Sequence, residues 1–299
     1  MLRQFLLTLI LSAFAQSTWA QDTVTITRFH EAGIGSVNTW IIEDSENIVL
    51  IDAQRTLRAG EQLAQTLQET GKNLRAVLIT HPHPDHIGGI PSIAAEFPDA
   101  QILAIQSVNE ELRSDSLGIM AFARRVNGDA FPAETPFASE LVKDGDILRY
   151  GDIELRVQDI GAGESIAMTV FFIPESNALF VGDLVDNDMH GFVFEQRSSQ
   201  WLVSLDEVRL DYASNPIAYP GHGASAPLFD LIDAQGKWLR DMRDIVNERI
   251  ADGEFSDQDV EESWAEFQRR HPNQLPVAPI DGLGPLNLRA VAAELAGRK

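Results

Sequence analysis

The stretch that decides the fold of this chain is AVLITHPHPDHIGG, residues 76–89. Four apolar residues lead into His81, His83, Asp85 and His86, and a glycine pair follows. So many lone pairs at one strand end would be costly to bury without a cation. Neutral imidazoles and a carboxylate suit zinc and related first-row metals. The alternative is a solvated polar loop, which would explain neither the apolar strand nor the glycine pair. We therefore predict a metal site at a strand end.

The spacing His81-x-His83-x-Asp85-His86 resembles the metal-binding signature of the metallo-β-lactamase superfamily. The resemblance implies an α/β fold, a four-layer αββα sandwich with the metals at one edge of its two sheets. It also implies that His81 and His83 lie in one metal site, and that Asp85 and His86 lie in an adjacent one.

Two later strand ends match the ligand positions of that family. Asp183 follows the apolar run 178–182, and it resembles the aspartate that bridges the two metals. His222 follows a short strand broken by Pro220 and Gly221, and it resembles the last histidine ligand. A turn carboxylate and a loop histidine are the alternatives.

The third expected position departs from the family pattern. Members commonly have a histidine after Gly-x-Gly, whereas this chain has Glu164 in Gly161-Ala162-Gly163-Glu164-Ser165. Two histidines and a glutamate are themselves a known zinc set. A carboxylate would add negative charge and make manganese or iron more competitive. We expect Glu164 to be a ligand; a supporting or capping role beside a weakened site is the alternative.

Asp52 ends the apolar strand 47–51 and matches an early aspartate of the family. In the family this residue usually orients the histidine loop by hydrogen bonds and binds no metal. Ligating groups need such support from behind. A simple turn aspartate is the alternative.

The first residues predict export. Arg3, an apolar run over 5–11 and small residues ending at Ala20 form the pattern of a secretory signal peptide over residues 1–20. That run is too short to span a bilayer, and no later segment is longer, so we expect no stable membrane insertion. We expect a periplasmic or secreted catalytic domain over residues 21–299. With no cysteine, its stability must come from a core.

The composition of the chain also limits the kinds of partner that we expect. The formal net charge of −22 would repel polyanions, which argues against nucleic-acid processing. The absence of cysteine excludes the thiolate ligand of some β-lactamase subclasses. The pattern is nearer to the cysteine-free subclass and to many lactonases and thioesterases. A small-molecule substrate is the partner we expect.

The remaining segments predict an alternating α/β layout. We expect two or three strands in 23–52, a helix over 61–70 ended by Gly71, a helix near 93–97, several strands over 146–180, and a helix over 201–212. A helical extension over about 228–299 would cover the sandwich or support a homodimer.

Two features near the expected cleft are ambiguous. Residues 108–136 look like an insertion, and Phe122, Phe131 and Phe137 within and beside it could line a substrate pocket or simply pack. His190 follows Asp183 closely enough to reach the same cleft. We predict it as a substrate-pocket residue, with a satisfied loop histidine as the alternative.

The resemblance implies a hydrolase with two divalent metals, most simply Zn²⁺, with manganese or iron as alternatives. Such metals generate hydroxide from water near neutral pH, which would cleave a small ester, lactone or β-lactam-like substrate. Asp85 is the candidate catalytic residue that shuttles a proton to the leaving group. A di-iron oxidoreductase and a non-catalytic metal-binding protein remain alternatives, because one fold hosts many chemistries.

Overall fold

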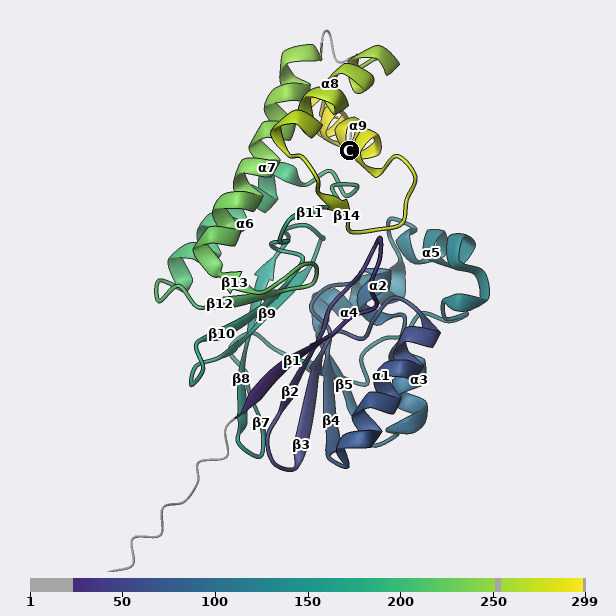
Figure 1. Ribbon diagram of the computed structural model, residues 1–299, viewed down its shortest axis with the longest axis vertical. Coiled ribbons are helices and arrows are strands. Elements are labelled where there is room, and N and C mark those ends of the chain that lie inside the picture. Colours follow the sequence, from purple (N-terminus) through teal and green to yellow (C-terminus); the bar gives the residue numbers. More distant parts are fainter. Residues whose placement is uncertain (1–23, 251–253, 298–299) are drawn as a thin grey trace, which may run out of the picture.

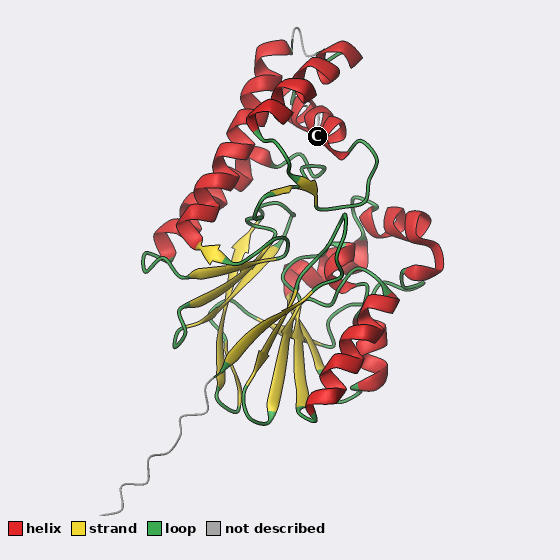
Figure 2. Cartoon of the chain, viewed as in Figure 1, coloured by secondary structure: helices red, strands yellow, loops and turns green. Residues whose placement is uncertain are grey.

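The computed structural model describes residues 24–250 and 254–297. The predicted signal peptide, residues 1–20, lies outside them. Two six-stranded sheets form the middle of the molecule, and helices lie on their outer faces (Figures 1 and 2). Among the helices of the described ranges, none is long and apolar enough to cross a membrane.

The first sheet has the strand order β1-β2-β3-β4-β5-β6. Strands β3 to β6 run parallel, whereas β1 and β2 join by antiparallel pairing. The central strands read as near-continuous apolar runs because both faces of the sheet are covered. The strands are β1 (Thr25–Phe29), β2 (Thr39–Glu43), β3 (Asn47–Ile51), β4 (Asn73–Leu78), β5 (Gln101–Ile105) and β6 (Glu140–Val142).

The second sheet has the order β13-β12-β10-β9-β8-β7 and is mostly antiparallel, with one parallel pair between β10 and β12. Phe171 and Phe180 lie in one continuous core with the apolar residues of the first sheet. The strands are β7 (Ile147–Tyr150), β8 (Ile153–Gly161), β9 (Met168–Ile173), β10 (Ala178–Gly182), β12 (Ile217–Pro220) and β13 (Ala226–Pro227).

Helices cover both outer faces and complete four layers. Helices α1 (Leu57–Thr70) and α3 (Ile90–Glu96) lie beside the first sheet, and α6 (Ser198–Asp211) and α7 (Leu228–Arg249) lie beside the second (Figure 1). Helix α1 starts four residues earlier than expected because the Thr56 side chain caps it, and Gly71 ends it as predicted. The predicted αββα sandwich is confirmed.

The C-terminal extension begins with α7, which contacts β12 and β13 of the second sheet. After α7 come α8 (Asp257–Arg270) and α9 (Leu283–Leu295), and both contact α7. Two short strands, β11 (Met189–His190) and β14 (Leu275–Pro276), pair and attach the extension to the loop after Asp183. The chain between α8 and α9 therefore returns to the loop that follows Asp183.

The 108–136 segment consists largely of helices α4 (Gln106–Ser114) and α5 (Ile119–Asn127), followed by the turn η1 (Gly128–Ala130). Its aromatic residues differ in role. Phe131 is buried in the core, Phe137 stacks against the Arg113 guanidinium, and Phe122 lines a cavity. Of the three, therefore, only Phe122 fits the pocket prediction. The short helix α2 (Pro84–Ile87) carries the end of the histidine loop.

Candidate metal centre

The predicted ligands meet at one edge of the two sheets. The histidine loop follows β4, Glu164 follows β8, Asp183 follows β10 and His222 follows β12. Backbone hydrogen bonds hold these strand ends together, since Thr169 N–H donates to the Thr80 carbonyl and Gly221 N–H donates to the Gly182 carbonyl. Residues up to 141 positions apart in sequence, His81 and His222, thus share one site.

The seven side chains fall into two groups of potential ligand atoms. The atoms of each group lie within 4.8 Å of one another. One group is His81, His83, Glu164 and Asp183, and the other is Asp85, His86 and His222. This division matches the one that the sequence predicts.

Asp183 lies between the two groups. Its Oδ2 atom is 3.8 Å from His81 Nε2 in the first group and 3.3 Å from His222 Nε2 in the second. Its Oδ1 atom is 3.4 Å from His86 Nε2. A carboxylate in this position can serve both groups, as the bridging prediction requires.

Each histidine has one ring nitrogen held from behind. His86 Nδ1 lies 2.7 Å from Asp52 Oδ2, and His222 Nδ1 lies 2.6 Å from the Ser36 carbonyl oxygen. Both partners only accept, so both Nδ1 atoms donate, which leaves both Nε2 atoms facing the centre as candidate metal ligands. Asp52 thus takes the orienting position expected for it.

The other two histidines are held in the same way. His83 Nε2 lies 2.9 Å from Glu195 Oε1. His81 Nδ1 lies 2.9 Å from Thr80 Oγ1, and this hydroxyl donates to Asp52 at 2.8 Å. Glu195 had no signal in the sequence, because it lies 112 residues from His83.

The atoms that face the centre lack hydrogen-bond partners. His81 Nε2, His86 Nε2, His222 Nε2, Asp183 Oδ1 and both carboxylate oxygens of Glu164 are buried and unpaired. Unpaired buried polar atoms are rare, because each costs free energy. Imidazole nitrogens and carboxylate oxygens are the donor set of divalent first-row metals. The groups therefore fit two such ions.

The charges at the centre lead to the same conclusion. Burial alone would lower the pKa of His222, but Asp183 and Asp85 raise it to about 10. Burial raises the pKa of Glu164 to about 7, although His83 opposes this. The carboxylates thus favour nearby positive charge, which protons or metal cations can supply.

Glu164 belongs to the group in which the family pattern places a histidine. Its Oε2 atom is 3.2 Å from His83 Nδ1 and 3.7 Å from His81 Nε2, and the residue is 2% exposed. This position fits a ligand better than a capping role, because neither oxygen accepts a hydrogen bond from a backbone N–H group.

Asp85 has a partner that the sequence did not reveal. Arg55 donates to Asp85 Oδ2 at 2.8 Å, and it also donates to the carbonyls of Gly35 and Val277. Burial alone would raise the pKa of Asp85, but Arg55 and then His86 hold it well below its usual value. This pairing favours the ionised form that binds a cation over the protonated form of a shuttle.

Two glycines let the strand ends approach the centre. A Cβ atom on Gly221 would lie 2.0 Å from Asp183 Oδ1. Gly182 has a φ of +52°, and a Cβ atom there would press on the Thr80 side chain. Both positions therefore exclude larger residues for steric reasons.

His190 belongs to neither group of ligand atoms and does not line the cavity beside His83. Its ring packs against Trp238, Trp264 and Phe267 of the C-terminal helices. The pairing of β11 with β14 places its backbone beside Pro276 of that extension.

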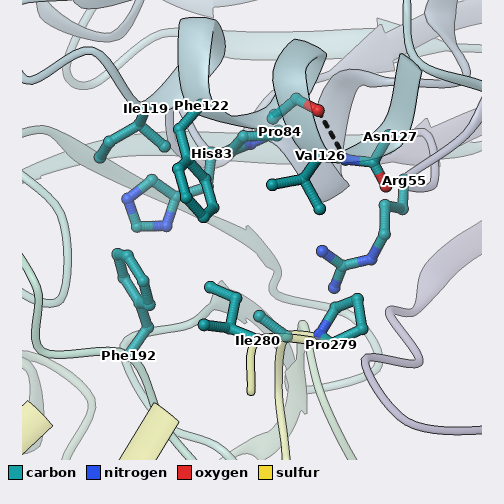
Figure 3. Close-up of a pocket in the computed structure, with 12 residues that line it drawn as sticks. Arg55, His83, Pro84, Ile119, Phe122, Val126, Asn127, Phe192, Pro279 and Ile280 are labelled. Atoms are coloured by element: carbon teal, nitrogen blue, oxygen red, sulfur yellow. Dashed lines mark hydrogen bonds between the residues drawn. The ribbon is translucent and has the colours of Figure 1, made fainter. Parts of the chain in front are cut away.

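A cavity opens beside the first group of ligands (Figure 3). Its lining includes His83 and Arg55, the α5 residues Ile119 and Phe122, and Ile280 of the C-terminal extension. The cavity is thus built from the insertion and the extension together.

The family model for the metallo-beta-lactamase superfamily matches residues 32–251. A hydroxyacylglutathione hydrolase of Prochlorococcus marinus is 24% identical over 184 residues, which are 61% of this chain and 63% of that protein. The lactamase-like protein aptB of Emericella nidulans is 27% identical over 238 residues, covering 78% of this chain and 63% of aptB. The chain thus spans less than two thirds of the length of these relatives.

Solved structures show the same fold. A metallo-beta-lactamase from Pontibacter korlensis superposes with a TM-score of 0.59 at 17% identity, covering 74% of this chain and 99% of that one. The DIM-1 metallo-beta-lactamase superposes with a TM-score of 0.57 at 23% identity, covering 73% and 90%. With the family model matched over most of its length, this chain belongs to the metallo-β-lactamase superfamily.

Proposed function

We propose that this protein is a metal-dependent hydrolase that cleaves a small ester, lactone or β-lactam-like substrate. The observation that supports it best is the pair of adjacent ligand groups with Asp183 between them. Four histidines held from behind by hydrogen bonds describe a preorganised centre, which is what catalysis by bound metal requires.

We propose two divalent ions, most simply zinc, with manganese or iron favoured somewhat by Glu164. When bound, such ions lower the pKa of water and polarise a carbonyl group. His81, His83, Glu164 and Asp183 would hold one ion, and Asp85, His86 and His222, with Asp183, would hold the other.

The side chains have separable tasks. Asp52 and Thr80 keep His86 and His81 in the ring orientation that ligation needs. Asp85 is our candidate for carrying a proton to the leaving group. Its ion pair with Arg55 makes it a weak base, so it would hold that proton only briefly.

The proposed substrates include more classes of compound than the name of any one relative suggests. The relative from Prochlorococcus is named for a glutathione thioester, and thioesters suit the same centre. We also propose that the chain is exported to the periplasm or secreted, which favours lactones or β-lactams over glutathione thioesters. The charge of −22 argues against nucleic acid as substrate.

The test begins with protein purified without added metal. Its metal content is measured, the metal is removed with a chelator, and zinc, manganese or iron is returned separately. We expect about two ions per chain and activity on a panel of esters, lactones and β-lactams that depends on the returned metal. Two bound ions with no turnover of any panel member would contradict a hydrolase of this class.

Glu164 supports one alternative, a di-iron oxidoreductase, because it adds a second carboxylate beside Asp183 in the first group. Native iron with redox-dependent absorbance would favour that alternative. Bound metal without turnover or redox change would leave a non-catalytic metal-binding protein.

A further inference from the structure

An apolar groove leads away from the metal centre. It begins at the cavity beside His83, where the Phe192 ring meets the His83 ring edge-on with a centroid distance of 5.4 Å (Figure 3). Ile119 and Phe122 of α5 lie on one side, and Ile280 of the C-terminal extension lies on the other. The inner end of the groove is therefore in contact with a candidate ligand.

The groove continues outward in a second cavity of about 270 Å³. The two cavities share Ile119, Phe122, Phe192 and Ile280, so they lie next to each other. The outer cavity adds Leu117, Phe194 and Leu286. The Phe194 ring stacks on Phe192 at 5.5 Å with an interplanar angle of 15°, which extends one aromatic wall from the centre to the surface.

The exposure of this wall is informative in so acidic a chain. Phe194 is 49% exposed and Leu117 is 52% exposed. Among the described residues that line the two cavities there is no carboxylate. Exposed apolar surface that is contiguous with a reactive centre marks a binding site for an apolar group.

We propose that this groove binds the apolar acyl chain or ring of the substrate and so sets its specificity. The proposal rests on the proposed hydrolase function. With its apolar part between α5 and Ile280, a substrate would place its carbonyl group beside His83 and the two ligand groups. The inner cavity is lined by His83 itself, which favours a small-molecule substituent over a docked protein segment.

The expected specificity follows from the burial of methylene groups. Each buried methylene contributes about 0.8 kcal/mol, which corresponds to a factor of about four in kcat/KM. Extending an acyl chain from acetyl to octanoyl should raise kcat/KM by at least a hundredfold, with a plateau once the groove is full.

The test uses p-nitrophenyl esters of acetate, butyrate, hexanoate and octanoate with the metal-loaded protein. We expect the octanoate to acetate ratio of kcat/KM to fall at least tenfold in F194A and in I280A. The matched control is L210A, because Leu210 is an exposed apolar residue of α6 that lines neither cavity. That variant should keep the wild-type ratio.

A binding measurement tests the groove independently of ester cleavage. 2-Decanone and 2-butanone carry a carbonyl group but no leaving group, and calorimetry would compare their affinities. We expect 2-decanone to bind at least tenfold more tightly, with the difference lost in F194A. If 2-decanone binds more tightly than 2-butanone but no ester is cleaved, the hydrolase function is refuted and the binding role of the groove is supported. If esters are cleaved with a kcat/KM that does not depend on chain length, the binding role of the groove is refuted and the hydrolase function is supported.

Discussion

Replacing Asp52 with asparagine tests whether the hydrogen bonds behind the ligands control metal binding. Asp52 is buried, and its Oδ1 accepts from Thr80 N–H at 2.9 Å. Its Oδ2 accepts from Thr80 Oγ1 at 2.8 Å and from His86 Nδ1 at 2.7 Å. Asparagine has only one carboxamide oxygen, so in either orientation its NH₂ group faces one of these donors.

The substitution changes the protonation of the His86 ring. If the amide NH₂ group replaces Oδ2, the ring must accept at Nδ1 and carry its proton on Nε2, the atom that faces the centre. Losing such an orienting partner lowers metal affinity by about 10–100-fold. That factor corresponds to about 1.4–2.7 kcal/mol. The loss should fall mainly on the group of Asp85, His86 and His222.

The assay is a zinc titration of metal-free D52N, followed by metal analysis after gel filtration. The matched control is D44N, because Asp44 is also buried and accepts from the backbone N–H groups of Glu46, Asn47 and Asp152. Each variant should lose about 1.5–3 kcal/mol of unfolding free energy. Only D52N should lose metal affinity. Wild-type zinc affinity at both steps in D52N would refute the reasoning.

Three further predictions concern single side chains. D183N should lower turnover by orders of magnitude while the circular dichroism spectrum is unchanged, because it weakens the one carboxylate shared by both groups; turnover within a few-fold of wild type would remove Asp183 from the centre. E164H should raise zinc affinity at the weaker of two unequal titration steps, because it exchanges a negative ligand for the imidazole usual at this position. E164A should lose about one metal per chain, because it removes a ligand. Unchanged metal content in both variants would show that Glu164 is not a ligand. Burial lowers the pKa of His190 from 6.5 to about 4, so the unfolded chain takes up the proton first and stability falls as the pH drops from 6.5 to 4. Urea unfolding at pH 7 and pH 4.5 should show a loss smaller by about 2 kcal/mol in H190F than in wild type, and an equal loss would contradict the burial argument.

The sequence by itself determined the fold class and the set of candidate ligands. Strand and helix signals are local, because side-chain period, turn residues and caps act within a few positions. The candidate ligands of the histidine loop, Asp183 and His222 follow apolar strands, and the ends of neighbouring strands meet at one edge. Glu164 could be placed because its Gly-x-Gly context matched the family position.

Only the tertiary structure decided which atoms support those ligands. Ser36 holds His222 across 186 residues, Glu195 holds His83 across 112, and Arg55 joins Asp85 to the C-terminal extension. His190 turned out to lie among the aromatic rings of that extension. The groove beside His83 likewise exists only where α5 meets residues near Ile280. The physical reason is that residue type and spacing are properties of the local chain, whereas hydrogen-bond partners and cavities arise when distant segments pack against each other.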